Sequence, residues 1–211
     1  MRVCYKAAMG HSRASKAITH ARLVEAAAAR FKERGIDGIS LADLMKELKL
    51  THGGFYRHFD SRDELVGEAL ELALAQSSES MRERLFEGTK PTFARFVEFY
   101  LDEAHRDGRA AGCAVAALAG DAARKSTDVQ GQFRRQIAQN LEALTSALDQ
   151  NPAEETRETA ILVLCALYGA LTVARAVGDS PLSREVLRTV RKRVLKLGAS
   201  PRKHRAKPKK N

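Results

Sequence analysis

The sequence contains no tryptophan and few residues that interrupt regular structure. Its 211 residues include 5 prolines, 8 phenylalanines and 4 tyrosines. Proline breaks helices and central strands, so its scarcity, together with the many alanines and leucines, favours a helical protein. Cysteine is scarce too, since Cys4, Cys113 and Cys165 are an odd number with no CxxC pair. This argues against a disulfide framework or a cysteine-based zinc site and favours a reducing compartment.

Long hydrophobic runs are missing as well. The N-terminus has no apolar segment of the kind found in signal peptides. The longest apolar run, Ala160–Ala174, covers 15 residues, which is fewer than the roughly 20 needed to span a bilayer. The sequence therefore predicts a cytoplasmic protein without a membrane partner. Its 44% apolar and 29% charged residues are typical of a soluble globular chain.

Motifs for catalysis and metal binding are also absent. The sequence has no GxSxG, no Walker loop, no HExxH and no Cys/His cluster with metal-ligand spacing. We therefore expect no enzyme, no catalytic residues, no metal and no cofactor. A helical enzyme with dispersed active-site residues has no positive feature in its favour.

Charge of one sign accumulates at the two ends of the chain. Residues 1–66 carry 12 basic and 8 acidic side chains, residues 67–183 carry 12 and 17, and residues 184–211 carry 12 and 1. Basic ends favour a polyanionic partner, because each neutralised phosphate releases counterions. The acidic middle segment, residues 67–183, suits contact with a second copy of itself or the binding of a small ligand.

Apolar residues recur with a period near 3.6 in nearly every segment, which predicts an all-α fold. The first expected helix ends near residue 34, and the next two cover 41–48 and 52–59. A longer helix runs from 62 to about 88, and further helical segments run from 91 to 107 and lie within 112–123. The last three helices cover 133–148, 152–177 and 181–197. No segment has the alternation of a convincing strand. No internal repeat stands out.

The first 60 residues have the pattern of three short helices, the last two joined by about three residues. Ser40 precedes the second helix, with Asp43 in its first turn, and Thr51 precedes the third. Hydroxyl side chains at these positions cap the free amides of a helix N-terminus. Ser61 and Glu64 have capping-box spacing at the start of a longer helix. Two short helices joined in this way are typical of a helix-turn-helix.

The segment Thr51–Phe59, THGGFYRHF, suits the helix of such a motif that enters the DNA major groove. Phe55 and Phe59 are one turn apart and would anchor it to the core, while His52 faces outward. The alternative is a short core helix whose glycines have no function.

Gly53 and Gly54 are poor helix formers, each costing roughly 1 kcal/mol relative to alanine. Their presence indicates that the missing side chains leave room for close approach to a partner. The next residues carry hydroxyl and cationic groups that would lie level with the DNA phosphates. They are Tyr56, Arg57 and His58.

Residues from about Thr19 to Glu68 resemble the DNA-binding domain of the tetracycline-repressor (TetR) family of bacterial transcription regulators. The resemblance rests on Phe31 with Arg34-Gly35, on the run Phe55–Phe59 and on Ser61–Leu65. It covers about a quarter of the chain, and the rest agrees with the family in helix count. It implies an N-terminal helix-turn-helix domain followed by a helical bundle for ligand binding and dimerisation.

The resemblance also implies which residues contact DNA. His52, Gly53 and Gly54 would face base edges, and the hydroxyl and cationic side chains around them would bind backbone phosphates. Lys49 departs from the family, which usually has glycine in this turn. A lysine there carries a steric cost if the backbone is left-handed, and it could place a cation near the DNA. The complete set is Ser40, Lys49, Thr51, His52, Gly53, Gly54, Tyr56, Arg57, His58 and Arg62.

Partners and domain boundaries follow from the same resemblance. Family members work as homodimers on double-stranded DNA with a palindromic operator, and a small-molecule effector, unidentified here, usually releases the DNA. We therefore expect a repressor in the bacterial cytoplasm, associated with the nucleoid. The apolar helix containing Ala160–Ala174 predicts a homodimer interface near 155–197. The expected domains are a basic flexible arm (1–18), the helix-turn-helix domain (19–66), the ligand-binding and dimerisation domain (67–197) and a disordered basic tail (198–211).

Polar groups within the apolar helices of the middle domain predict an effector pocket, because such pockets are mostly apolar with a few placed polar groups. The candidates are Tyr100, His105, Cys113, Tyr168, Thr172 and Arg175. Two alternative functions stay open. One is a thiol-sensing regulator acting through Cys113, which lies in a glycine-flanked segment, and the other is a nonspecific chromosome-associated protein that binds DNA through its basic ends.

Overall fold

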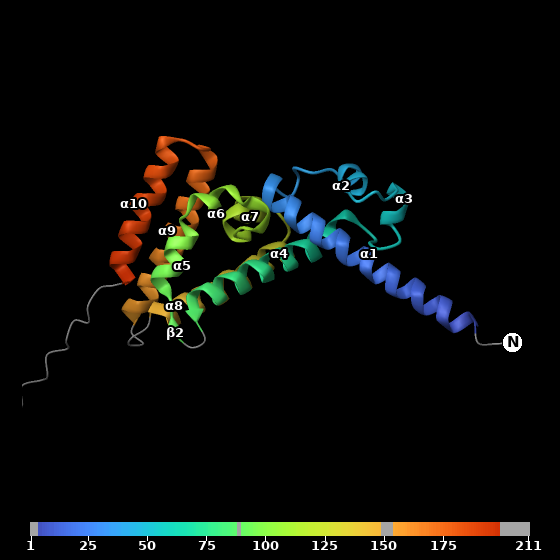
Figure 1. The fold of residues 1–211 in the computed structure, drawn as a ribbon, viewed down its shortest axis with the longest axis horizontal. Helices are drawn as coiled ribbons and strands as arrows, with labels where there is room; N and C mark the ends of the chain where they lie inside the picture. The colour runs from blue at the N-terminus through green and yellow to red at the C-terminus, as the bar shows by residue number, and fades with distance from the viewer. Residues whose placement is uncertain (1–3, 88–89, 149–153, 199–211) are drawn as a thin grey trace, which may run out of the picture.

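The structure is a computed structural model that describes residues 4–87, 90–148 and 154–198 (Figure 1). The described chain is helical apart from one pair of two-residue strands, and the predicted all-α fold is confirmed. Its elements are α1 (Cys4–Arg34), α2 (Leu41–Glu47), α3 (His52–Phe55), α4 (Arg62–Leu85), β1 (Phe86–Glu87), β2 (Lys90–Pro91), α5 (Phe93–Tyr100), α6 (Glu103–Asp107), the 3-10 helix η1 (Arg109–Ala111), α7 (Ala114–Ala122), α8 (Thr127–Leu148), α9 (Glu154–Ala176) and α10 (Pro181–Gly198).

Helices α1, α2 and α3 form one end of an elongated molecule, and α4 runs from there into a bundle at the other end (Figure 1). The predicted caps shape the first part. The side-chain oxygens of Ser40, Thr51 and Ser61 each accept a hydrogen bond from the backbone amide three residues later. The Glu64 carboxylate also accepts the amide of Asp60. These bonds fix where α2, α3 and α4 begin, because they satisfy amides that have no partner within the helix.

The core of this end is built around two phenylalanines. The rings of Phe55 and Phe59 stack with centroids 5.3 Å apart, and both side chains are buried. Leu23, Ala27 and Phe31 of α1, spaced at i, i+4 and i+8, are buried in the same core. The expected anchoring of the third helix by its two aromatic residues is therefore confirmed.

The larger part of the molecule is a bundle of α4, α8, α9 and α10, with α5, α6 and α7 packed against it. Its centre holds Leu70, Phe133, Leu144, Leu167 and Leu187, all buried. The strand pair β1–β2 is a short antiparallel connection between α4 and α5. This part fixes the far ends of α1 and α4 and so positions the small helices α2 and α3.

The helix predicted over 91–107 is wrong as a single element, because the structure divides it into α5 and α6. Asp102 causes the interruption. Its carboxylate accepts a hydrogen bond from the amide of Ala104 at 2.8 Å and caps a new helix start. The third helix is also shorter than expected, since α3 ends at Phe55 and a hydrogen-bonded turn continues to Phe59.

The two predicted terminal segments have different outcomes. The segment expected as a flexible arm, 1–18, is helical from Cys4 onward and forms the N-terminal part of α1. This stretch contains no proline and several alanines, so nothing in it stops the helix. The predicted tail, 198–211, lies outside the described residues except for Gly198, the last residue of α10.

Within the described chain, α9 is long and apolar enough to cross a membrane by length and composition, with a mean hydropathy of 1.8 in its most apolar window. A core helix of a soluble protein passes the same test. One face of α9 is buried against α8 and α10, through Val163, Leu167 and Leu171. Its other face is exposed at Leu162 and Val173, and this is the face expected to pack on a partner subunit in the predicted homodimer.

Candidate nucleic-acid interface and ligand pocket

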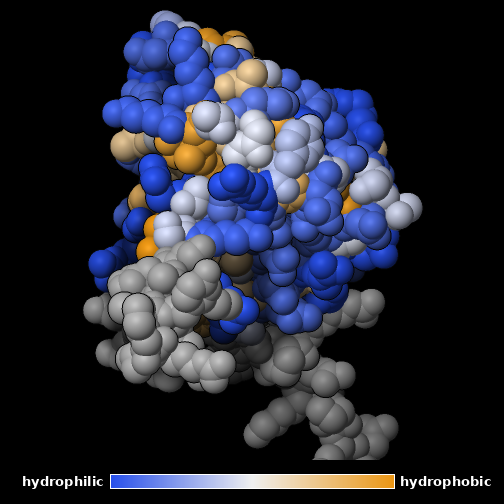
Figure 2. All heavy atoms as spheres, turned by 90° about the vertical axis from the view of Figure 1, so that its right-hand side faces the viewer, coloured by the Kyte–Doolittle hydropathy of each residue, from blue (hydrophilic) through white to orange (hydrophobic). Residues whose placement is uncertain are grey.

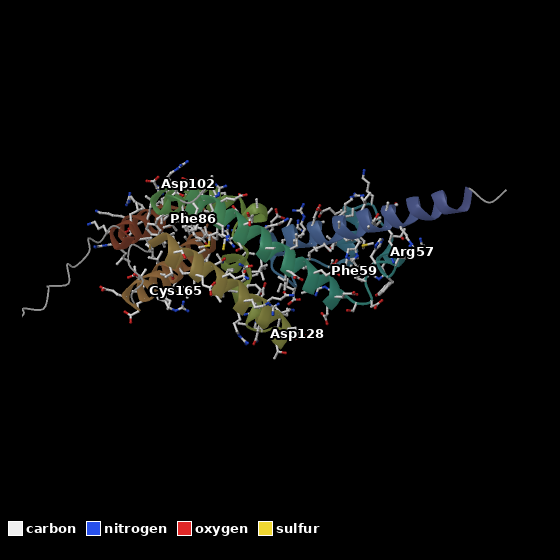
Figure 3. The ribbon with its side chains drawn as sticks, turned by 90° about the horizontal axis from the view of Figure 1, so that it is seen from below. Arg57, Phe59, Phe86, Asp102, Asp128 and Cys165 are labelled. Atoms are coloured by element: carbon white, nitrogen blue, oxygen red, sulfur yellow. The ribbon has the colours of Figure 1, made fainter. Side chains whose placement is uncertain are left out.

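The helix α3 and the turn after it have one buried and one exposed face. Tyr56 is 60% exposed, and His52 and Arg57 are exposed beside it. Figure 3 shows Arg57 at the outer edge of this end, while Phe59 lies beneath α1. Seen from this end, the molecule is mostly hydrophilic, with hydrophobic side chains only scattered over it (Figure 2).

The two glycines of α3 occupy different surroundings. A Cβ atom added at Gly53 would meet no atom within 4 Å, whereas one at Gly54 would lie 3.3 Å from the Thr51 hydroxyl. Gly53 therefore leaves open space on the exposed face. Packing within the protein therefore does not require a glycine at this position.

The turn before α3 carries the predicted departure at Lys49. Its backbone has a φ of 58°, the left-handed conformation that favours glycine. The Lys49 side chain is exposed. Ser40 and Thr51 are also exposed, although the Ser40 hydroxyl donates to Asp43 Oδ2 at 2.6 Å.

Two predicted phosphate ligands, Arg62 and His58, lie partly buried against the protein. Arg62 Nη2 donates to the carbonyl of Ile36 at 2.6 Å, which holds the loop between α1 and α2. His58 is half-buried, and its Nδ1 has no hydrogen-bond partner among the described residues. Burial, with the nearby cations of His20 and Lys16, lowers the pKa of His58. The structure thus brings the expected set together on one end but turns these two side chains inward.

A junction that the sequence did not reveal ties this end to the bundle. Asp121, in α7, accepts a hydrogen bond from the backbone amide of Ile36 at 3.0 Å. Lys125 follows α7 and forms an ion pair with Asp37 at 2.8 Å, which lowers the pKa of the Asp37 carboxyl. Gly35, at φ 84°, lets the chain pass this close, since a Cβ there would lie 2.9 Å from Asp121 Oδ2.

The bundle contains a small cavity of about 30 Å³ between α4, α5, α8 and the start of α7. Four of the six predicted effector-binding residues line it: Tyr100, His105, Cys113 and Tyr168. Ligand pockets commonly have volumes of about 300–1,000 Å³, so this cavity is much smaller than an ordinary ligand site. A ligand of ordinary size requires its walls to move.

The polar groups of the cavity are incompletely paired. The Tyr100 hydroxyl is buried near the Cys113 thiol but makes no hydrogen bond with any described residue, and burial raises its pKa. His105 Nδ1 lies 2.8 Å from the carbonyl of Tyr100, and its Nε2 lies 3.3 Å from the amide of Cys113. These contacts fit a neutral ring protonated at Nδ1, and burial lowers the pKa of His105 accordingly. Tyr168 accepts a hydrogen bond from Asn140 Nδ2.

The other two predicted pocket residues do not line this cavity. Thr172 Oγ1 donates to the carbonyl of Ala116, and Arg175 donates to the carbonyls of His105 and Arg106. Both hold α9 against the elements that form the pocket wall. Cys113 is buried and its sulfur accepts the Ala116 amide at the start of α7, and the thiol-sensing alternative stays a prediction.

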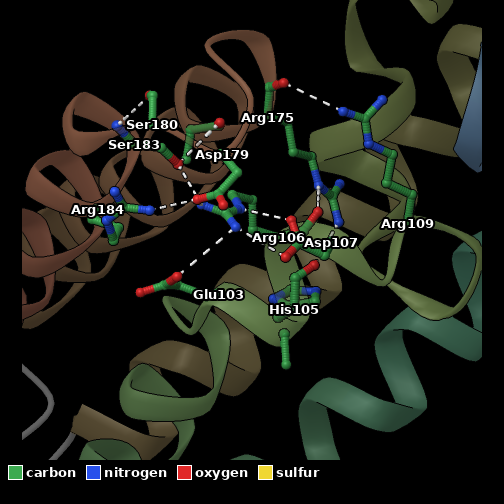
Figure 4. Close-up of polar contacts among 12 residues, drawn as sticks. Glu103, His105, Arg106, Asp107, Arg109, Arg175, Asp179, Ser180, Ser183 and Arg184 are labelled. Carbon is green, nitrogen blue, oxygen red and sulfur yellow. Dashed lines mark hydrogen bonds and ion pairs between the residues drawn. The ribbon is translucent and has the colours of Figure 1, made fainter.

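Arg106 anchors the same region and was not expected from the sequence. Its guanidinium is 3% exposed and contacts Asp107, Asp179 and Ser183 (Figure 4). The hydrogen bonds that Arg106 donates to the Asp107 carboxylate are the main reason that the pKa of Arg106 is raised. This network joins α6 to the turn between α9 and α10.

Comparison with known families agrees with this arrangement. Residues 23–69 match the family described as "Bacterial regulatory proteins, tetR family", and residues 90–192 match the "Transcriptional regulator LmrA/YxaF-like, C-terminal domain". The chain belongs to the TetR family. The family consists of DNA-binding transcription regulators that are not enzymes, and the TetR-family assignment makes this chain a soluble, cytoplasmic protein.

Curated relatives match this TetR-family chain over a short stretch. The "HTH-type transcriptional repressor Rv3405c" of Mycobacterium tuberculosis is 39% identical over 51 residues, which are 24% of this chain and 27% of that protein. The "HTH-type transcriptional regulator Mb3439c" of Mycobacterium bovis matches to the same extent. The chain thus aligns with about a quarter of the length of these relatives.

Solved structures of TetR-family regulators share the whole fold. A regulator from Cytophaga hutchinsonii has a TM-score of 0.73 at 18% identity, covering 88% of this chain and 95% of that one. A regulator from Chloroflexus aurantiacus has a TM-score of 0.72 at 23% identity, covering 85% and 93%. Within the described residues, no group of three or more His, Cys, Asp or Glu side chains could hold a metal ion.

Proposed function

We propose that this TetR-family chain is a homodimeric repressor that binds a palindromic operator and leaves it when a small molecule enters the bundle. The observation that carries the proposal is the exposed face of α3, where His52 and Tyr56 point outward and Gly53 leaves open space, above a buried aromatic anchor. A major groove about 12 Å wide admits such a helix.

The contacts divide by chemistry. His52 and the glycine backbone at 53 and 54 face base edges, which carry sequence information. Tyr56, Arg57 and Lys49 bind backbone phosphates, and the hydroxyls of Ser40 and Thr51 lie at the edge of the same surface. Arg62 and His58 act indirectly, since Arg62 holds the α1–α2 loop and His58 is half-buried behind α3.

The homodimer interface is the exposed apolar face of α9 with the adjoining edge of α10. Residues on this face include Ile161, Leu162, Val173, Val177 and Leu182, which are 38–62% exposed. Contiguous apolar surface of this kind marks protein–protein contact. A two-fold dimer places two copies of α3 on half-sites about one helical turn, or a multiple of it, apart.

The effector enters the small cavity beside Tyr100 and Cys113, and α7 carries the change to the DNA-binding end. The first residue of α7 follows Cys113 at the pocket wall, and Asp121 near its other end holds Ile36. A ligand that opens the cavity displaces α7 and thereby the α1–α2 loop. This is allosteric because DNA and effector favour different states of the molecule.

Selection of bound duplexes from a random pool tests sequence-specific binding. We expect enrichment of a palindrome, and binding to it at 150 mM salt that is at least about 1,000-fold tighter than to a scrambled duplex, as is usual for specific regulators. A protein that binds both duplexes equally would instead be a nonspecific chromosome-associated protein. We also expect the protein to associate with the nucleoid, because the nucleoid contains both the operator and the nonspecific DNA that this measurement compares.

Asp121→Ala tests the coupling route. The variant leaves the amide of Ile36 without a partner, and an unsatisfied buried group costs roughly 1–3 kcal/mol. We expect hydrogen exchange of the Ile36 amide to become about 10- to 100-fold faster, because ~1.4 kcal/mol corresponds to a factor of ten. Mass spectrometry of deuterated peptides covering residues 35–40 measures it.

Asp121→Asn is the matched control, since it keeps an acceptor oxygen and should preserve most of the protection. Lys125→Met removes only the exposed ion pair to Asp37, which is expected to contribute less than about 1 kcal/mol. Equal exchange in wild type and Asp121→Ala would show that this hydrogen bond does not hold the loop.

A further inference from the structure

An open groove of about 670 Å³ runs along α10 at its contact with α6. Its floor is apolar, formed by Leu187 and Leu195, and its rim is basic. One acidic residue, Glu103, also lines it. The basic lining residues are Arg184, Arg188, Arg191, Lys192 and Lys196.

The charge of this groove is mostly uncompensated. Arg184 is paired with Asp179 at 2.6 Å. Among the described residues, Arg188, Lys192 and Lys196 have no carboxylate within ion-pair distance, and Glu185 is the single acidic residue of α10. Like charges four residues apart on a helix destabilise it. The helix keeps three such pairs, a repulsion that a polyanion would relieve.

The basic edge of α10 is distinct from the edge proposed for dimerisation. Arg188 and Leu197 are nine residues apart, so at 3.6 residues per turn they point to opposite sides of the helix. Leu182, on the apolar edge, is likewise well separated from Arg188. The basic edge turns toward α5 and α6, and a partner subunit on α9 leaves it accessible.

The spacing of these cations fits a nucleic-acid strand. Arg184, Arg188, Lys192 and Lys196 recur every fourth residue and span about 18 Å along the helix. A DNA strand carries about five phosphates over that length. The sequence that follows α10 adds positive charge, since residues 199–211 contain six Lys and Arg and no acidic side chain. A small anion needs two or three cations, so the length of this run favours an extended polyanion.

We propose that the α10 groove is a second, sequence-independent DNA-binding site at the end of the molecule opposite α3. Figure 1 shows α10 and α3 at the two ends of the long axis. A molecule bound to its operator through α3 holds a second DNA segment through α10 at the opposite end. The groove therefore bridges DNA.

A test of the groove itself uses a chain whose α3 face is blocked by Gly53→Glu and a random-sequence 30-base-pair duplex. We expect residual binding at 50 mM salt, measured by fluorescence anisotropy. Adding Arg188→Glu and Lys192→Glu should weaken it at least tenfold. It should also reduce the slope of log affinity against log salt by about 2, because each lost phosphate contact contributes about 0.9.

The matched control adds Arg134→Glu and Arg135→Glu, which reverse two exposed charges on α8 and give the same net charge. We expect less than a twofold effect from this pair. An equal loss of DNA affinity in both variants would show that only the net charge of the protein matters. No loss of affinity from the α10 pair would mean that the groove does not bind DNA. Either result overturns the proposal. The proposal is also overturned if the groove binds an acidic protein, and not the duplex, at the same salt concentration.

Bridging is measured with the otherwise unaltered chain. A selected operator duplex on beads, saturated with the protein, should capture a labelled random duplex. The Arg188→Glu/Lys192→Glu variant should keep operator binding within twofold and lose this capture. Failure of operator selection would contradict the proposed repressor function alone, because the blocked-α3 experiment does not depend on an operator. Capture that survives in the variant contradicts the bridging role.

Discussion

Gly53→Glu is expected to abolish operator recognition while leaving the fold intact. A Cβ atom at position 53 meets no protein atom within 4 Å, so we expect the added side chain to project outward from α3. There it would both fill the space needed for close approach and place a carboxylate against the phosphates. We expect operator affinity to fall at least about 100-fold, equivalent to ~2.7 kcal/mol. Fluorescence anisotropy with the selected duplex measures the loss.

Gly120→Glu is the matched control for this substitution. Gly120 lies within α7, and a Cβ there also meets no atom within 4 Å. The control adds the same side chain and the same charge to an exposed helical glycine away from α3. It should bind the operator within about threefold of wild type, and both variants should keep the wild-type circular dichroism. Similar losses in the two variants would show that α3 does not read the DNA.

The DNA-binding end could be predicted from sequence because its determinants are local. The caps Ser40, Thr51 and Ser61 each bond within three residues, and Phe55 and Phe59 are one turn apart. Such short-range patterns are visible in the sequence itself. A left-handed backbone at Lys49 was considered because the TetR family usually has glycine in this turn, and Lys49 does adopt it with a φ of 58°.

The contacts that the sequence did not predict join residues far apart in the chain. The hydrogen bond between Asp121 and Ile36 spans 85 positions, and the one between Arg106 and Ser183 spans 77. Neither partner has a neighbour in sequence that indicates the other. Arg62 was assigned to DNA because it is a cation at the start of α4, yet the fold places the carbonyl of Ile36 within its reach.

The residues of the cavity could also be predicted only in part from the sequence. Tyr100, His105, Cys113 and Tyr168 were singled out as polar groups in apolar helices, and all four line one cavity. Periodicity could not distinguish them from Thr172 and Arg175, because a helical pattern indicates which residues face inward but not which neighbouring element they meet. His105, which lines the cavity, lies in α6, after the break at Asp102.

Leu162→Glu is expected to convert the dimer into monomers. Leu162 is 62% exposed in the protomer, so the substitution leaves the bundle core unchanged. In a two-fold interface each substitution occurs twice, and two unpaired carboxylates are removed from water together. We expect the dissociation constant of the dimer to rise at least about 100-fold, or ~2.7 kcal/mol. Light scattering at micromolar concentration measures the mass.

The matched control is Ile18→Glu, since Ile18 is also 62% exposed but lies on α1. This variant should still have the molecular mass of a dimer in light scattering. The Leu162→Glu monomer should bind a single half-site as wild type does, yet lose the added affinity of a palindrome, because the two recognition helices are no longer linked. A dimer that persists in Leu162→Glu would place the interface on another surface, and the half-site spacing would then need a different geometry.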